Sequence, residues 1–358
     1  MKTILFILPD LNQGGAERVI TILCNELDRS KYLPKLILFK KEGYYLNHLS
    51  SDVEIIELNI SRIRYSIFKI IPLIFKIKPD IVFTGWGEIS AFLSPIIPLF
   101  PKVRFITRET NVVSNHVTRK SILFFYRFYN NFHQIIAQSD DMKEDLMKNF
   151  NISENKIVKI NNPVDFKLID KMKSKQVNLG FDKSCKNIVA IGNLSPRKGF
   201  DLLLNVMNQL KEEKIHLTIL GDGAFKGNLL EQKDQLKLTN VTFKGKVDNP
   251  FVYLKEADLF ILSSRYEGFP NVLLEAGACG TYSLANDCPG GINEIIENGI
   301  NGEIILINDY KASAEKIKEI LLKEISNDRV IKSIYSRFNK KFIIRKYEDC
   351  FDLNEMYK

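Results

Sequence analysis

Two glutamates lie eight positions apart around the expected start of a helix, in the segment SSRYEGFPNVLLEAGACG. An apolar run over residues 257–262 is long enough for a buried parallel strand and too short for a separate helix. A glycine and a proline indicate a loop after this strand, and residues 272–278 have helical composition. The spacing therefore places Glu267 in the loop and Glu275 in the first turns of the helix.

This arrangement suits the binding of an anion with hydroxyl groups. Open α/β sheets bind phosphorylated ligands where a strand ends and a helix begins, because free backbone N–H groups and the helix dipole point at the anion. A carboxylate one turn into that helix, such as Glu275, can accept hydrogen bonds from the vicinal hydroxyls of a ribose. The alternative is that Glu267 and Glu275 are solvated charges on a loop and a helix.

The segment EGFPNVLLE resembles the E-x7-E signature of retaining glycosyltransferases of family four. Other stretches agree in order and spacing, so the resemblance covers nearly the whole chain. It implies an α/β protein of the GT-B fold, with two facing Rossmann-like domains and a deep interdomain cleft. We expect an acceptor-binding domain over residues 1–165, a nucleotide-sugar-binding domain over residues 166–339, and a helix over about residues 340–358 that crosses back to the first domain. Residues 166–184 are polar and lysine-rich, which indicates the linker between the domains.

Composition agrees with such a protein. The 358 residues suffice for about two domains, each with its own core. We expect no signal peptide, and no apolar run reaches the roughly 18 residues that span a bilayer. The five cysteines are scattered without a metal-ligand or C-x-x-C spacing, which favours free thiols in a reducing cytoplasm.

The net charge of +8 is concentrated in the first half of the chain, where six basic residues and one acid lie between Lys102 and Gln134. Residues 66–78 and 114–136 are both basic and rich in aromatic side chains. These stretches predict either packed helix faces or an anionic membrane contact, and both hold if different faces of one helix are involved. We expect no nucleic-acid partner, because the basic residues belong to no helix-turn-helix, RRM or zinc pattern.

A double glycine, Gly14 and Gly15, separates the first expected strand from the first helix. Glycines let the backbone approach a phosphate without interference from Cβ, although tight turns use them as well. The segment GGAER resembles the opening loop of the family, whose glycines approach the donor diphosphate and the acceptor.

The strand expected over residues 103–107 ends at Arg108 and Glu109. In many family members a histidine follows this strand and contacts the transferred sugar, and here the nearest imidazole is His116. Either Glu109 or His116 takes over that contact, with Arg108 beside the sugar or acceptor, or neither does. A surface ion pair between Arg108 and Glu109 is the alternative.

The segment GNLSPRKG, after a strand expected over residues 187–191, resembles the family's donor phosphate loop, with Lys198 in the place of its lysine. Two fixed cations commonly hold the nucleoside diphosphate in this family, and its arginine after the first glycine is replaced here by Asn193. Either Arg197 supplies the second charge from a different direction, or the site works with one cation and helix amides.

Other turns complete the resemblance. It implies a turn beneath the nucleotide, a backbone contact with the nucleobase and a glycine-rich element near the sugar, at Gly221, Lys246, Val247, Gly290, Gly291 and Glu294.

Sugar transfer requires stabilisation of the charge on the departing diphosphate. The resemblance assigns this to Lys198, with Arg197 and the amides near Asn271 and Val272, and assigns the ribose to Glu275.

Glu267 would orient the hydroxyls of the sugar and stabilise positive charge at the anomeric carbon, so we expect a catalytic set of Lys198, Glu267 and Glu109. We expect no divalent metal or other cofactor, since no D-x-D motif and no cluster of metal-ligand spacing is visible.

The resemblance thus implies a retaining glycosyltransferase, which we expect on the inner face of a bacterial plasma membrane. It would move a hexose or N-acetylhexosamine from a nucleotide sugar, expected to be a UDP-sugar, to a polyprenyl-diphosphate-linked saccharide during O-antigen, capsule or related glycan assembly. A noncatalytic GT-B scaffold is the alternative, because the family's arginine and histidine are replaced. A GT-B sugar-nucleotide epimerase is disfavoured by the E-x7-E element.

Overall fold

The computed structural model describes residues 1–12 and 14–353. The chain divides into two compact units: unit 1 is Met1–Pro163 with the chain from Lys341 onward, and unit 2 is Val164–Lys340. Residues 354–358 of the expected C-terminal helix lie outside the described residues. No helix within the described ranges combines the length and the apolar character needed to span a membrane.

Unit 1 contains a seven-stranded parallel sheet in the order β3-β2-β1-β4-β5-β6-β7. Its strands are β1 (Lys2–Leu8), β2 (Tyr32–Leu38), β3 (Glu54–Glu57), β4 (Ile81–Thr84), β5 (Arg104–Arg108), β6 (Gln134–Ala137) and β7 (Ile157–Lys159). The order reverses between β1 and β4, and ligands of such sheets bind at the carboxyl ends of the strands near that reversal.

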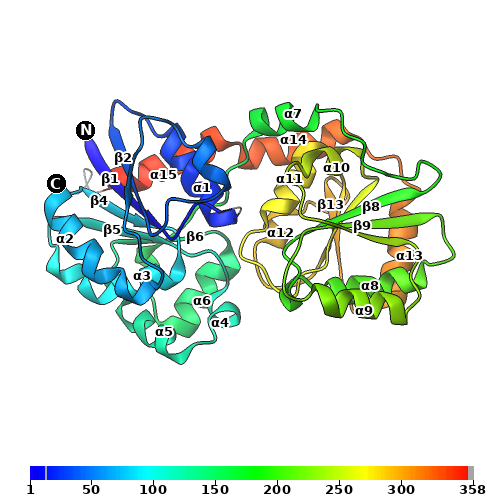
Figure 1. The fold of residues 1–358 in the computed structure, drawn as a ribbon, viewed down its shortest axis with the longest axis horizontal. Coiled ribbons are helices and arrows are strands. Elements are labelled where there is room, and N and C mark those ends of the chain that lie inside the picture. The colour runs from blue at the N-terminus through cyan, green and yellow to red at the C-terminus, as the bar shows by residue number, and fades with distance from the viewer. Residues whose placement is uncertain (13, 354–358) are drawn as a thin grey trace. The chain divides into compact units, whose positions relative to one another are not determined.

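Helices cover both faces of this sheet (Figure 1). One face packs against η1 (Tyr44–His48), α1 (Gly15–Glu26) and α15 (Lys340–Asp352). The other face packs against α2 (Ile67–Ile77), α3 (Gly87–Leu93), α4 (Val113–His116), α5 (Lys120–Phe125), α6 (Asp140–Phe150) and the 3-10 helices η2 (Ile63–Tyr65), η3 (Ser94–Leu99) and η4 (Tyr126–Asn131). A further 3-10 turn, η5 (Glu154–Lys156), precedes β7.

The last helix belongs to unit 1 because one of its faces is apolar. Ile343, Tyr347 and Phe351 recur at helical spacing and are buried against the sheet. At the end of α15, Lys2 Nζ lies 2.7 Å from Asp352 Oδ1, which ties the helix to β1.

Unit 2 contains a six-stranded parallel sheet in the order β10-β9-β8-β11-β12-β13. Its strands are β8 (Lys186–Ile191), β9 (Ile215–Leu220), β10 (Val241–Gly245), β11 (Leu259–Leu262), β12 (Ser283–Asn286) and β13 (Gly302–Ile305). The order reverses between β8 and β11, so these two neighbouring strands mark the expected ligand edge.

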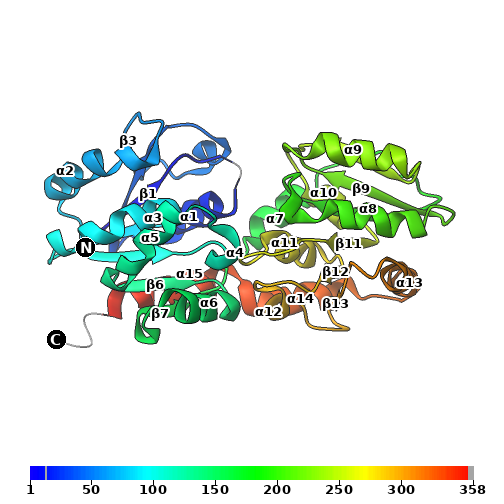
Figure 2. The same cartoon turned by 90° about the horizontal axis from the view of Figure 1, so that it is seen from below.

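Two helical layers also enclose this sheet. One layer is α7 (Phe166–Lys173), α10 (Phe251–Glu256), α11 (Asn271–Cys279), α12 (Ile292–Ile295) and α14 (Asn327–Phe338). The other is α8 (Phe200–Gln209), α9 (Lys226–Gln235) and α13 (Tyr310–Leu321), and the 3-10 turn η6 (Pro196–Lys198) precedes α8. Figure 2 shows α8 and α9 side by side.

Two local expectations need correction. Residues 166–184 have the lysine-rich composition of a linker, but α7 occupies the start of this stretch, with Phe166 and Ile169 buried in unit 2. Two apolar residues three positions apart suffice to dock one face of a short helix. The strand expected over residues 257–262 begins only at Leu259, because the Asp258 carboxylate accepts a hydrogen bond from the Asn187 backbone N–H instead.

Candidate active site

The carboxyl ends of β8 and β11 bring the phosphate-loop turn η6 next to the loop that precedes α11. The two strands pair directly, and the Ser263 hydroxyl donates to the Lys198 carbonyl at 2.8 Å. A Cβ on Gly199 would stand 2.0 Å from the Ser263 carbonyl oxygen, and the backbone there has a φ of +63°. Glycine is required for both reasons, and it lets the two loops touch.

A buried ion pair joins these loops. Lys198 Nζ lies 2.5 Å from Glu267 Oε1, and only 7% of Lys198 and 5% of Glu267 are exposed. The Ser264 hydroxyl donates to the same carboxylate at 2.6 Å. Burial opposes ionisation of Glu267, but Lys198, Arg197 and these hydrogen bonds outweigh it and lower the pKa. The carboxylate is therefore charged at neutral pH.

A second cation converges on the same carboxylate. Arg197 Nη1 lies 3.8 Å from Glu267 Oε2, and the guanidinium lies over the Tyr266 ring at 5.7 Å from its centre. Asn193 stands where the family that the sequence resembles has an arginine, and its side chain packs against the turn at Gly223. A Cβ on Gly223 would lie 2.3 Å from Asn193 Oδ1. The positive charges on this loop thus come from two consecutive residues.

The glycine-rich element holds the other side of the Glu267 loop. The Glu267 N–H donates to the Pro289 carbonyl at 2.9 Å, and the Gly291 N–H donates to the Gly268 carbonyl at 2.8 Å. At Gly290 the backbone has a φ of +130°, and a Cβ would stand 2.7 Å from the Glu267 carbonyl oxygen. Gly290 and Gly291 therefore pack on the loop that presents Glu267.

The remaining donor candidates follow from the same edge. Helix α11 begins at Asn271, and Glu275 lies one turn further on, half-buried. The turn at Gly221 is joined to the end of β10, where its N–H donates to the Gly245 carbonyl at 2.9 Å, just before Lys246 and Val247. The short helix α12 begins directly after Gly291 and contains Glu294, whose side chain is half-buried.

An arginine that the sequence analysis did not single out clamps the phosphate loop. The Arg265 guanidinium makes two hydrogen bonds to Asp201, at 2.8 Å and 2.6 Å, and another to the Pro196 carbonyl. Its backbone N–H donates to the Arg197 carbonyl at 2.8 Å. Because Asp201 lies in the first turn of α8, the clamp closes around the turn that carries Arg197 and Lys198. No short sequence motif joins residues 64 positions apart.

In unit 1, Gly14 and Gly15 begin α1 after β1. A Cβ on Gly14 would stand 2.1 Å from Glu17 Oε2, so the missing side chain leaves room for a carboxylate over the first turn. Burial raises the pKa of Glu17 to about 7, although a hydrogen bond from its own backbone N–H lowers the pKa in part. Glu17 is a second residue that the sequence analysis did not single out.

Arg108 and Glu109 do not form the surface ion pair that was one alternative. Successive residues of a strand point to opposite faces, and both side chains are buried, with 1% of Arg108 and 3% of Glu109 exposed. Arg108 Nη2 donates to Asn162 Oδ1 at 2.5 Å, while its Nε and Nη1 have no hydrogen-bond partner among the described residues.

Glu109 is enclosed by aromatic hydroxyls on the other face. Tyr129 donates to Glu109 Oε1 at 2.7 Å, and the stacked Tyr126 ring places its hydroxyl 3.5 Å away. Burial raises the pKa of Glu109 to about 7, although the hydrogen bonds from Tyr129 and Tyr126 lower it in part. A Cβ on Gly87 would stand 3.1 Å from Glu109 Oε2, so the carboxyl group lies under the loop after β4. His116 is exposed on α4.

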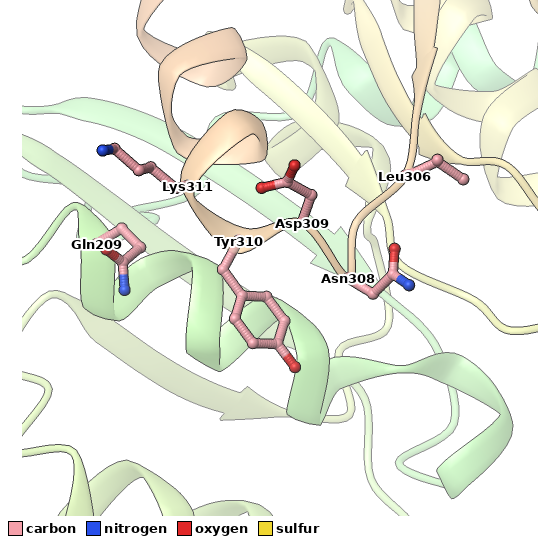
Figure 3. A pocket seen from close by; sticks show the side chains of 6 residues that line it. All are labelled: Gln209, Leu306, Asn308, Asp309, Tyr310 and Lys311. Atoms are coloured by element: carbon pink, nitrogen blue, oxygen red, sulfur yellow. The ribbon is translucent and has the colours of Figure 1, made fainter.

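Within the described residues, no group of three or more His, Cys, Asp or Glu side chains is arranged to hold a metal ion. A separate shallow hollow of about 510 Å³ on unit 2 is lined by Gln209, Leu306, Asn308, Asp309, Tyr310 and Lys311 (Figure 3). It contains none of the candidate residues.

The two sheets and their order define the GT-B fold. Among solved structures, that of Anabaena Alr3699/HepE in complex with UDP and glucose superposes with a TM-score of 0.83 at 19% identity, over 98% of this chain and 100% of that chain. Two family models match consecutive parts of the chain: "Glycosyltransferase Family 4" over residues 13–168 and "Glycosyl transferases group 1" over residues 171–337. The chain belongs to family 4 of the glycosyltransferases.

Curated relatives agree with this assignment. A Campylobacter jejuni protein named N-acetylgalactosamine-N,N'-diacetylbacillosaminyl-diphospho-undecaprenol 4-alpha-N-acetylgalactosaminyltransferase is 26% identical over 87% of this chain and 88% of its own length. An uncharacterized glycosyltransferase of Methanocaldococcus jannaschii, MJ1059, is 29% identical over 64% of this chain. The match spans less than two thirds of that relative, 61% of its length.

The raised pKa of Glu109 predicts a pH-dependent effect of Glu109→Gln on stability. An acid whose pKa is higher in the folded state stabilises the fold less as the pH rises from 4.5 through about 7. The variant keeps an acceptor for Tyr129 and removes the ionisation. We expect it to be more stable than the wild type by roughly 2–3 kcal/mol at pH 8 and by less than about 1 kcal/mol at pH 5.

Urea denaturation at the two pH values measures this difference. An equal effect of the substitution at pH 5 and pH 8 would contradict the burial of an ionisable carboxyl group at this position.

The clamp predicts that Arg265→Ala raises the KM for the nucleotide sugar about tenfold, because the turn with Arg197 and Lys198 loses its bidentate support. Arg265→Lys, which keeps one hydrogen bond, should restore part of the loss. Steady-state kinetics measure both. The control is Lys318→Ala, which breaks an ion pair of 2.7 Å with Glu315 on α13. Equal kinetics for Arg265→Ala and the control would rule out a positioning role.

Proposed function

We propose that the protein transfers a hexose or N-acetylhexosamine from a UDP-sugar to a lipid-linked saccharide, with retention of configuration, in the synthesis of a cell-envelope polysaccharide. The observation that carries this proposal is the buried Lys198–Glu267 pair at the carboxyl ends of β8 and β11, with Arg197 beside it and α11 following. Fixed cations and helix amides at one edge are what a departing diphosphate requires.

In the proposed reaction, the bond between the anomeric carbon and the diphosphate oxygen breaks, and the acceptor hydroxyl forms its new bond on the same face of the sugar. The hydroxyl proton passes to an oxygen of the departing diphosphate. Lys198, Arg197 and the amides at Asn271 and Val272 stabilise the charge on that diphosphate. These donors are fixed before reaction, since Lys198 is already held by Glu267.

Glu267 orients the hydroxyls of the transferred sugar and stabilises the positive charge that develops at the anomeric carbon. Its lowered pKa keeps it ionised for this role. Glu275 accepts hydrogen bonds from the ribose, one turn into α11, and Lys246 and Val247 present backbone groups to the base. The proposal also assigns contacts with the transferred sugar to Gly290, Gly291 and Glu294.

Unit 1 supplies the acceptor side of the proposal. Gly14 and Gly15 lie at the start of α1, and Arg108 ends β5 with Glu109 directly after it, at the carboxyl edge of the unit 1 sheet. The Glu109 carboxyl group is enclosed by Tyr126 and Tyr129. Its proposed role is therefore to hold the loop at Gly87 in position, and that loop contacts the acceptor.

The donor and acceptor classes are supported by the relatives. The Anabaena structure holds UDP and glucose, and the name of the Campylobacter relative contains a diphospho-undecaprenol acceptor. An acceptor of that kind is anchored in a membrane, so we place the enzyme at the inner face of the bacterial plasma membrane.

A donor screen tests the proposal. The purified protein is incubated with UDP-, GDP- and ADP-sugars, with and without EDTA, and hydrolysis or transfer to a polyprenyl-diphosphate sugar is followed. We expect one UDP-sugar to be used with or without EDTA. Lys198→Ala should lower kcat about 10²–10³-fold through loss of a charge-stabilising donor, and Glu275→Ala should raise the KM for the donor.

The matched control is Lys311→Ala, which removes an exposed lysine at the hollow in Figure 3 and should leave kinetics unchanged. Absence of binding and turnover with every nucleotide sugar would favour the noncatalytic scaffold, with Asn193 in place of the family's arginine as the reason.

A further inference from the structure

Four large apolar side chains project from one helical layer of unit 1. Phe68 and Phe75 on α2, Leu99 on η3 and Phe124 on α5 are 72%, 57%, 59% and 51% exposed. Single exposed apolar residues are common on protein surfaces, whereas a group of them on adjoining elements marks an interaction site.

The elements that carry these residues adjoin one another. The Phe75 ring lies 4.8 Å from the ring of Phe100, which directly follows η3. At the other end of η3, the Ser94 hydroxyl donates to the Phe125 carbonyl on α5 at 3.0 Å. All three elements pack on one face of the β1–β7 sheet, and Figure 1 shows α2 and α5 on the same side of it.

Phe68 belongs to the same surface. It precedes Phe75 by seven residues, which is about two turns of α2, so both rings leave the helix on the same side. The exposed residue Pro72 lies between them. We call this surface, with Phe68, Phe75, Leu99 and Phe124, the α2–η3–α5 face.

The surroundings of this face are positively charged. Residues 58–79, 89–108 and 110–139 contain no Asp or Glu. Lys76, Lys102 and Lys120 are exposed and form no ion pair with any side chain in the described part of the chain. Arg127 lies over the Phe124 ring at 4.5 Å, so a cation and an apolar side chain are presented together.

Two of the acids that adjoin these segments have partners of their own. Glu88 lies 3.4 Å from Arg119, and Asp80 Oδ2 accepts a hydrogen bond from the Thr3 backbone at 2.7 Å. An apolar surface with cations, whose own segments contain no carboxylate, is complementary to an anionic surface.

We infer that the α2–η3–α5 face docks on a bilayer of anionic lipids. Its aromatic and leucine side chains enter the boundary between head groups and acyl chains, and the surrounding lysines contact lipid phosphates while their alkyl stems lie along the apolar surface. Core packing accounts for other aromatic residues of the same stretch, since Tyr126, Tyr129 and Phe132 are buried.

The docked face reaches the carboxyl edge of the unit 1 sheet. Arg119, which precedes α5, pairs with Glu88 in the first turn of α3, and α3 begins at Gly87 over the Glu109 carboxyl group. Docking through α5 therefore holds the proposed acceptor residues close to the lipid surface. The inference rests on the proposed function for its purpose, a membrane-anchored acceptor, while the binding itself is measured without any sugar.

Vesicle cosedimentation tests the inference, with vesicles of phosphatidylglycerol and phosphatidylcholine in equal parts and vesicles of phosphatidylcholine alone. The variants are Phe68→Ser with Phe75→Ser, and Lys76→Glu with Lys102→Glu. We expect the wild type to bind the anionic vesicles, the first variant to bind at least about tenfold more weakly, and the second at least about twentyfold more weakly.

The matched control combines Phe342→Ser with Lys346→Glu. Both residues are exposed on α15, which covers the opposite face of the same sheet, so this variant should bind vesicles as the wild type does. Thermal melting checks that each variant is folded. If the phenylalanine variant does not fold, the lysine variant still tests the inference.

Equal binding by the wild type and the two α2–η3–α5 variants overturns the inference, as does equal binding to the neutral vesicles. Absence of vesicle binding by the wild type also overturns it and favours a protein partner for this face. Donor turnover without vesicles is the separate readout for the proposed function. A wild type that binds anionic vesicles but turns over no donor contradicts the reaction and leaves the docking surface standing.

Discussion

The candidate active site depends on one buried ion pair between Lys198 and Glu267. Removing both charges from water carries a desolvation penalty that a single contact rarely offsets. Here the Ser264 hydroxyl and the Arg197 guanidinium also serve the carboxylate, so the charged form of Glu267 is favoured although it is buried. The result is a set of charges whose positions are fixed before any ligand arrives, which is the condition for electrostatic stabilisation of a transition state.

The surrounding structure serves to keep that pair in place. Gly199 and Gly290 allow backbone contacts that any side chain would prevent, and the Arg265–Asp201 clamp closes the turn with Lys198. In unit 1 the polar groups at the sheet edge are arranged differently. Glu109 and Glu17 are buried with raised pKa values, so the carboxyl groups at that edge ionise less readily than Glu267 does. In the proposed function this difference suits a charged donor in unit 2 and a neutral acceptor hydroxyl in unit 1.

Much of the fold follows from short-range pattern. The apolar strands, the loops after them and the helix at Asn271 can be found because a parallel strand buried on both faces is continuously apolar. The resemblance singled out Glu267 in the E-x7-E segment and Lys198 in the phosphate loop, and the structure brings Glu267 Oε1 within 2.5 Å of Lys198 Nζ. Prediction from sequence pattern was wrong where only one or two apolar residues dock an element on the core. Helix α7 docks through Phe166 and Ile169 within a lysine-rich stretch, and composition alone favoured a linker.

The sequence by itself predicted the buried strands from local apolar runs. The spacing of its motifs carried the resemblance that implied two Rossmann-like sheets, the family and the candidate donor residues Lys198, Arg197 and Glu267. The tertiary structure alone decided which of these groups touch. It placed Arg108 and Glu109 on opposite faces of a strand, paired Arg265 with Asp201, and left Phe68, Phe75 and Phe124 exposed while Tyr126 and Tyr129 were buried. Burial and contact depend on residues far apart in the chain, and no local pattern contains that information.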